Sequence, residues 1–145
     1  MEFQKIKLHR SEKRGSAVTQ ITLDDDYNVP DYRQDIVKVI KEHGELRFDE
    51  VKAMEGAAWI KGSLIFKVLY RSDKQEGKIS CLRGEIPFQE RLNMDGLSEY
   101  DAVHAVGDIE DLTVGVINSR KLNIRAVIVL TASADTEVDE ELTCE

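Results

Sequence analysis

The stretch from residue 117 to residue 130 constrains the fold more than any other part of this 145-residue chain. It opens with Asn118 and Ser119, which favour turns, and continues as a run in which every second residue is apolar. The alternating residues are Leu122, Ile124, Ala126, Ile128 and Leu130, while Val127 and Val129 make the second face apolar. We therefore expect a strand in the middle of a core, paired as a hairpin with a preceding strand at residues 103–116.

Other stretches alternate in the same way, with turn residues between them. They are predicted strands at residues 3–10, 17–23, 46–51, 59–70 and 79–85. Gly62 predicts a bulge or a bend, and Pro87 restricts residues 86–88 to a sheet edge or a crossing segment. The polar residues 73–77 predict a hairpin loop.

One segment breaks the alternation and predicts a helix from residue 32 to residue 42. Its apolar residues are spaced three and four positions apart, as on one face of a helix. They are Tyr32, Ile36, Val39 and Ile40. Asp31 would cap the first turn and Gly44 would end the helix. The whole pattern predicts a mainly β (α+β) fold, an antiparallel β-sandwich of about seven to nine strands with one short helix.

Length and charge indicate one domain with an acidic end. A chain of this length can bury roughly two-thirds of the surface that it exposes when unfolded. The net charge is −8, and six acidic residues without a Lys or Arg follow Ala134. Removing these six from the 28 acidic residues leaves 22 against 20 basic residues, so the remainder is near neutral and does not favour nucleic acid. We predict a single domain at residues 1–134 and an acidic tail or linker at residues 135–145.

The sequence holds no arrangement that predicts catalysis, a cofactor or a metal. Residues 24–26 are aspartates that match the start of a calcium loop, but its later glycine and glutamate do not follow. The histidines His9, His43 and His104 lack the spacing of metal ligands. Cys81 and His104 lie on different predicted strands, so they do not predict a nucleophile and its base. We expect no catalytic, cofactor-binding or metal-binding residues and no enzymatic activity.

Hydropathy and cysteine usage bear on where the protein acts. No stretch reaches the about 18 consecutive apolar residues of a membrane span, and the first residues lack the apolar run of a secretory signal. The two cysteines, Cys81 and Cys144, are far apart and do not favour a structural disulfide. These features predict a cytosolic protein without a membrane span.

Basic residues near two predicted strand ends are candidates for binding a partner. Lys5 and Lys7 place charge along the first predicted strand, as in edges that are protected from indiscriminate pairing. Arg120 and Lys121 form a basic cluster at the final turn, which could meet an acidic surface, including that of another copy. We predict these four side chains as interaction residues.

An alternative function is a carbohydrate-binding module on a sandwich face. The single Trp59 could stack on sugar rings together with Tyr27, Tyr70 and Tyr100. Aromatic residues make up only 6% of the chain, so the core is expected to need most of these rings.

Several short segments occur in an order that is more specific than any one of them. They are residues 28–31 (NVPD), 35–40 (DIVKVI), Gly62 with 66–70 (FKVLY), 86–88 (IPF) and 118–122 (NSRKL). Together they resemble the SPOCS domain of clostridial spore-coat assembly proteins, over roughly residues 17–132.

The resemblance implies a structural and interaction module of the spore coat that acts without cofactors. It implies a place in the mother-cell cytoplasm at the forespore surface, with other spore coat or morphogenetic proteins and further copies as partners. In similar proteins a C-terminal LysM module, often after further SPOCS copies, is associated with contact to the ATPase SpoIVA. No such module is present in this sequence, so contact with SpoIVA is expected only through a longer parent protein.

Overall fold

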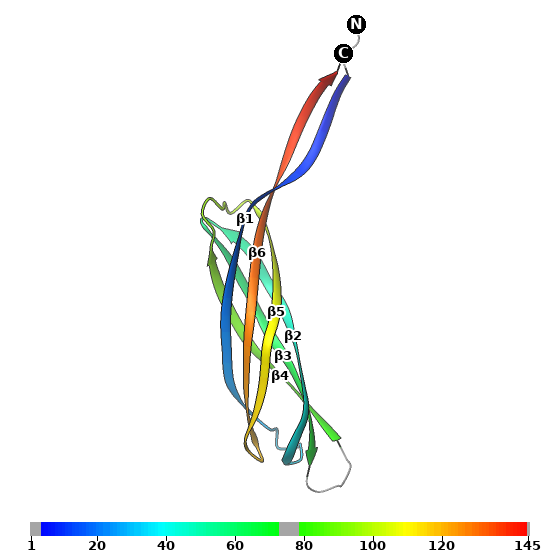
Figure 1. The fold of residues 1–145 in the computed structure, drawn as a ribbon, viewed down its shortest axis with the longest axis vertical. Coiled ribbons are helices and arrows are strands. Elements are labelled where there is room, and N and C mark those ends of the chain that lie inside the picture. The colour runs from blue at the N-terminus through cyan, green and yellow to red at the C-terminus, as the bar shows by residue number, and fades with distance from the viewer. Residues whose placement is uncertain (1–3, 73–78, 145) are drawn as a thin grey trace.

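The computed structural model describes the backbone of residues 4–72 and 79–144 and the side chains of residues 15–72 and 79–135. Its strands are β1 (Gln4–Asn28), β2 (Ile36–Met54), β3 (Ala57–Ser72), β4 (Ile79–Asn93), β5 (Ala102–Asn118) and β6 (Lys121–Cys144). They form two three-stranded antiparallel sheets with the orders β1-β6-β5 and β2-β3-β4 (Figure 1). The fold is therefore mainly β, with six strands instead of seven to nine.

The strand with the clearest alternating pattern in the sequence, β6, is the central strand of its sheet. β6 lies between β1 and β5, and the side chains of Ile124 and Ile128 are fully buried, as are the other alternating apolar residues of this run. Asn118 pairs with Lys121 across a two-residue turn, which confirms the predicted hairpin of β5 and β6.

The helix predicted at residues 32–42 is wrong, since β2 begins at Ile36 and the described residues contain no helix. Two register shifts, between Ile36 and Lys38 and between Val39 and Lys41, each place one extra residue of β2 opposite β3. The first shift turns both Ile36 and Val39 toward the core although they are three positions apart. Bulges in a strand therefore produced a spacing that is typical of a helix.

The residues expected to begin and end that helix have other roles. Asp31 lies in a turn in which the Arg33 N–H donates to the Pro30 carbonyl oxygen at 2.9 Å. Tyr32 is 81% exposed, and Gly44 lies within β2. The β-branched residues after Ile36 favour a strand, which agrees with the observed element.

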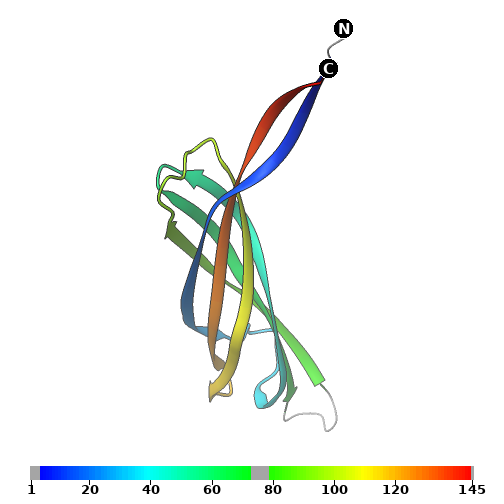
Figure 2. The same ribbon diagram turned by 45° about the horizontal axis from the view of Figure 1, so that its top comes forward.

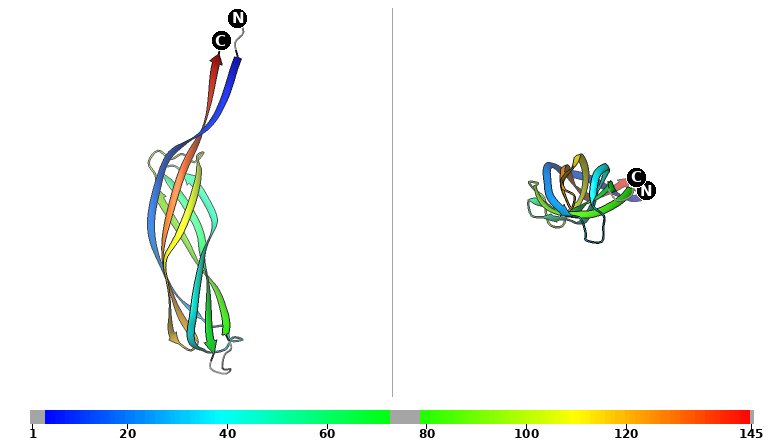
Figure 3. Two further views of the ribbon diagram at one scale, coloured as in Figure 1. Left: turned by 45° about the vertical axis from the view of Figure 1, so that its right-hand side comes forward. Right: turned by 90° about the horizontal axis from the view of Figure 1, so that it is seen from below.

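One hydrophobic core contains buried side chains from both sheets. Every second residue of β3 faces it, from Ile60 to Tyr70, and the buried row of β6 faces it from the other sheet. Figure 3 shows the strands of both sheets arranged around this interior. The finer description of the fold as a sandwich stays a prediction.

The first and the last strand, β1 and β6, pair along their whole length. The predicted strands 3–10 and 17–23 belong to one strand, β1, with a register shift between Lys13 and Gly15. Beyond that shift β1 and β6 continue as a two-stranded ribbon, in which Gln4 lies opposite Cys144 (Figures 1 and 2). The backbone of residues 135–144 thus continues β6, and the domain boundary at residue 134 stays a prediction.

Two of the remaining sequence signals, Pro87 and Gly62, lie in the sheet β2-β3-β4. Pro87 lies in β4, which is an edge strand as expected. Gly62 lies opposite Phe48, where a register shift occurs in β2 rather than in β3. The predicted loop at residues 73–77 lies outside the described residues. The described part of the chain contains no helix that is long and apolar enough to cross a membrane.

Candidate interaction surfaces

One arginine fastens the turn between β5 and β6 to the connection between β1 and β2. Arg120 Nη1 donates to the carbonyl oxygen of Arg33 at 2.7 Å and to Asp35 Oδ1 at 3.1 Å. Its Nη2 donates to the carbonyl oxygens of Val29 at 3.2 Å and Pro30 at 2.8 Å. The planar guanidinium fork suits several acceptors in fixed positions. We call this set of residues the Arg120 clasp.

Backbone hydrogen bonds reinforce the clasp. The Val29 N–H donates to the Arg120 carbonyl oxygen at 2.8 Å, and the Ile36 N–H donates to that of Ser119 at 2.9 Å. The Asn118 side chain accepts from the Arg120 N–H at 2.8 Å, which shapes the turn. Residues 28–31 and 118–122, far apart in sequence, therefore meet at one end of the molecule.

The same connection is also bound to the second sheet. The Tyr70 hydroxyl donates to the Gln34 carbonyl oxygen at 3.2 Å, and Ser72 Oγ donates to Gln34 Oε1 at 2.5 Å. The Tyr27 hydroxyl donates to the Arg83 carbonyl oxygen at 3.1 Å. Polar contacts thus hold the connection between β1 and β2 to β3, and hold β1 to β4, at the end of the molecule that carries the clasp.

The four predicted interaction residues occupy different environments. Arg120 is committed to the clasp, and Lys121 Nζ lies 3.6 Å from Asp26 Oδ2 in an exposed ion pair. Lys5 and Lys7 lie in β1 where its backbone pairs with β6, but their side chains are outside the described part. Their role in binding a partner stays a prediction.

The aspartates that resembled a calcium loop lie in an extended strand, β1. Asp24 and Asp26 point to one side, where both accept hydrogen bonds from Asn123 Nδ2, at 2.7 and 3.0 Å. The hydrogen bond from Asn123, together with the charge of Lys121, lowers the pKa of Asp26. Among the residues with described side chains, no group of three or more His, Cys, Asp or Glu is placed to hold a metal ion.

The aromatic residues of the carbohydrate alternative are not gathered on one face. Tyr70 is fully buried, and the ring of Tyr27 packs edge-on against Phe66 with centroids 5.3 Å apart. Trp59 is half-buried and alternates with the buried residues of β3, so it faces away from the core. Tyr100 is 90% exposed in the connection between β4 and β5. This arrangement does not form a shared stacking platform.

Cys81 and His104 are likewise separated. Cys81 is exposed on β4, whereas His104 lies on β5 in the other sheet. The nearest acidic partner of His104 is Asp135, with Nε2 and Oδ2 4.0 Å apart. The structure therefore does not assemble a thiol with an imidazole base.

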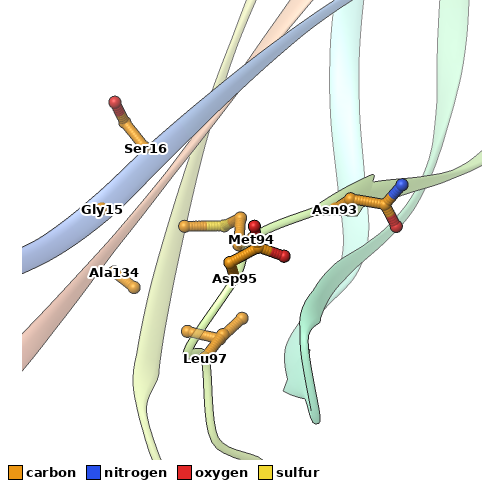
Figure 4. A pocket seen from close by; sticks show the side chains of 7 residues that line it. All are labelled: Gly15, Ser16, Asn93, Met94, Asp95, Leu97 and Ala134. Atoms are coloured by element: carbon orange, nitrogen blue, oxygen red, sulfur yellow. The ribbon is translucent and has the colours of Figure 1, made fainter.

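A small cavity lies between β1, β6 and the connection that follows β4 (Figure 4). Its volume is about 150 Å³, and it is lined by Gly15, Ser16, Asn93, Met94, Asp95, Leu97 and Ala134. Pockets that enclose drug-sized ligands usually have volumes of roughly 300 to 1,000 Å³. This cavity is too small for such a ligand.

A family comparison matches the part of the chain that contains β2, β3, β4 and nearly all of β5. The family model described as the SipL SPOCS domain matches residues 35–117, which is more than half of the chain. The match begins at the clasp residue Asp35 and ends within β5. No curated protein and no solved structure matches the chain.

Proposed function

Because the chain belongs to the SipL SPOCS-domain family, we propose that it is a non-enzymatic interaction module in spore coat assembly. The family match over residues 35–117 is the observation that carries this proposal, since it indicates a sporulation-related domain. The role in the spore coat, the binding of other proteins and the absence of catalysis are proposals. They follow from what the sequence resemblance implies, and two of the segments that carry this resemblance, residues 28–31 and 118–122, meet in the clasp.

The surface of the described body supports a role in binding proteins. Each sheet presents three long strands side by side, and the rigid clasp holds the strand connections at one end. Broad surfaces on rigid elements suit contacts between proteins better than capture of a small ligand. We therefore assign the proposed function to the outer surfaces of the sheets.

The proposed partners are other spore coat or morphogenetic proteins at the forespore surface, in the mother-cell cytoplasm. Contact with SpoIVA would require a longer parent protein. The carbohydrate-binding alternative has less support, because Trp59 and Tyr70 lie on opposite faces of β3.

Affinity capture from sporulating cells tests this function. The full chain is immobilised and exposed to extracts of sporulating and of vegetative cells, and the captured proteins are identified by mass spectrometry. An unrelated acidic domain of similar size serves as the control bait. We expect spore coat or morphogenetic proteins to be enriched from the sporulating extract alone. Equal capture by both baits, or the same proteins from vegetative cells, would overturn the proposal.

A further inference from the structure

The outer surface of the sheet β2-β3-β4 carries a cluster of positive charge. The residues concerned are Lys38, Lys41, Lys67, Arg71 and Arg83, all exposed, and we call them the basic face. In the strand register Lys67 lies opposite Arg83, and Arg71 lies opposite Lys38. Side chains in such positions have Cβ atoms about 5 Å apart, so their like charges repel one another.

Two acids lie among these charges within the described residues: Glu42 lines one hollow with Lys41 and Lys67, and Glu45 Oε1 lies 3.2 Å from His43 Nε2. None of the Lys and Arg side chains of the basic face forms an ion pair with another described side chain. Glu85, the acid on the next row, is bound by Arg47, whose Nη1 lies 3.0 Å from Oε1. Exposed apolar surface lies among the charges, from Ile79 (55% exposed) and Leu69 (36%). The basic face therefore combines unpaired charge with apolar area.

The outer surface of the other sheet has the opposite charge. Its carboxylates are Asp24, Asp26, Asp108, Glu110 and Asp111, all exposed, and we call them the acidic face. Two cations lie on the same surface, Arg125 opposite Asp24 and Lys121 3.6 Å from Asp26, so the carboxylates outnumber the cations. Asp108 and Asp111 lie opposite Val129 and Val127 of the central strand, so no cation faces them across that pair of strands. Val18 and Val106, 66% and 61% exposed, lie opposite Thr131 from its two sides and add apolar area.

We propose that the basic face of one copy of this domain binds the acidic face of a second copy. This inference rests on the proposed interaction role, because it names another copy of the domain as a partner in that role. Charge complementarity between the two faces of one chain is the main argument. Because the two faces differ, the contact is of the head-to-tail kind, which adds copies in a row rather than closing a symmetric pair.

The size of the faces fits a stable contact. Three strands about 4.8 Å apart, with roughly fifteen residues at about 3.3 Å each, present roughly 700 Å². Standard protein interfaces bury about 800 Å² on each partner. A nucleic acid would use only the basic face and would be repelled by the acidic one, so a second copy explains both surfaces.

Sedimentation velocity of the purified full chain over a range of protein concentrations tests the inference. At about 50 mM NaCl the sedimentation coefficient should rise with concentration, and at about 500 mM NaCl the dissociation constant should increase at least about tenfold, because salt screens exposed charges. A chain that stays monomeric at every concentration in low salt would overturn the inference.

Paired charge reversals identify the two faces. Lys41→Glu with Lys67→Glu removes most of the net charge of the basic face, and Asp108→Lys with Asp111→Lys does the same to the acidic face. Each double variant alone should associate far more weakly than the wild type, because one of its two faces then has little net charge. An equal mixture of the two variants should associate again, since the unchanged acidic face of one variant binds the unchanged basic face of the other.

A matched control distinguishes the effect of where the charges are changed from the effect of the change in net charge. Glu55→Lys with Glu99→Lys changes the net charge as much as the acidic-face variant does, at exposed sites outside both faces. This control should associate like the wild type. A mixture of the face variants that stays monomeric, or face variants that associate like the control, would overturn the inference. Salt-dependent binding of a nucleic acid by a monomeric chain would also overturn it.

Self-association and capture of coat proteins are measured independently, so the inference and the proposed function can fail separately. A monomeric chain that still captures coat proteins from sporulating cells contradicts the inference and supports the function. A self-associating chain that captures no coat protein supports the inference and contradicts the function.

Discussion

Arg120 and Asp35 form an ion pair of 3.1 Å although 85 residues separate them in the sequence. The same guanidinium binds the carbonyl oxygens of Val29, Pro30 and Arg33. One side chain therefore holds the connection between β1 and β2 against the turn between β5 and β6. The clasp links the first sheet to the start of the second, so its loss should affect the whole fold.

Replacing Arg120 with Ala should lower the free energy of unfolding by about 2 to 3 kcal/mol, because hydrogen bonds to charged groups are lost and acceptors lose their donor. Arg120→Lys should recover only part of the loss, because an ammonium cannot reproduce the fork. Urea denaturation measures both. Lys121→Ala is the control, with a loss within about 1 kcal/mol for its exposed ion pair. Equal losses for Arg120→Ala and Lys121→Ala would contradict the clasp.

Truncating the central strand should be costly. Ile128→Ala removes a fully buried side chain of β6, and we expect a loss of about 2 to 5 kcal/mol because a cavity remains. Val18→Ala, at a largely exposed position of β1 in the same sheet, should change the stability by no more than about 0.5 kcal/mol. Chemical denaturation of both variants gives the comparison, and similar values for the two would place Ile128 outside the core.

Gly62 should not tolerate a side chain. A Cβ at this position would overlap the carbonyl oxygen of Arg47, where the register shift brings β2 close to β3. We expect Gly62→Ala to cost about 1 to 3 kcal/mol, because the backbone must move. Gly115→Ala is the matched control in β5, where a Cβ meets no atom within 4 Å. Thermal unfolding midpoints measure both, and a neutral Gly62→Ala would contradict the close approach.

The pKa of Asp26 should depend on Asn123. The hydrogen bond from the Asn123 amide is the largest cause of the lowered pKa, so Asn123→Ala should raise it toward the usual value of about 4. A carboxyl whose pKa is lower in the folded state stabilises the fold above its unfolded pKa. That stabilisation is lost as the pH falls through the folded pKa.

An NMR titration of the Asp26 carboxyl measures this pKa in the wild type and in Asn123→Ala. The variant should also lose less stability than the wild type on acidification below about pH 4. Thr22→Ala, at an exposed position of the same strand, is the control. An unchanged pKa of Asp26 in Asn123→Ala would show that the hydrogen bond does not act on this carboxyl.

Local patterns predicted part of the fold correctly. The β5–β6 hairpin was predictable because the alternation from Leu122 to Leu130 is uninterrupted and a turn precedes it. The helix prediction failed because the inserted residues in β2 place Ile36 and Val39 on one side at a spacing of three. A pattern of spacing alone does not distinguish such bulges from a helical turn.

The surfaces depend on contacts that a single sequence does not reveal. The sequence places Arg120 in a basic cluster, but its acceptors lie up to 91 positions away, so the sequence alone does not predict the clasp. The near-neutral composition of residues 1–134 does not indicate that positive and negative side chains lie on the outer surfaces of different sheets. The alternation of Lys61, Lys67 and Arg71 with buried residues of β3 was a signal for this separation of charge, but using that signal required the strand order.

Fluorescence imaging of the full chain in sporulating cells tests the central claim most directly, namely that this SPOCS domain acts through protein contacts during spore assembly. A fusion of the chain to a fluorescent protein is compared with the fluorescent protein alone, in vegetative cells and through sporulation. We expect the fusion to gather around the forespore, while the fluorescent protein alone stays evenly distributed. An even distribution of the fusion throughout the mother cell would contradict the proposed role in spore assembly.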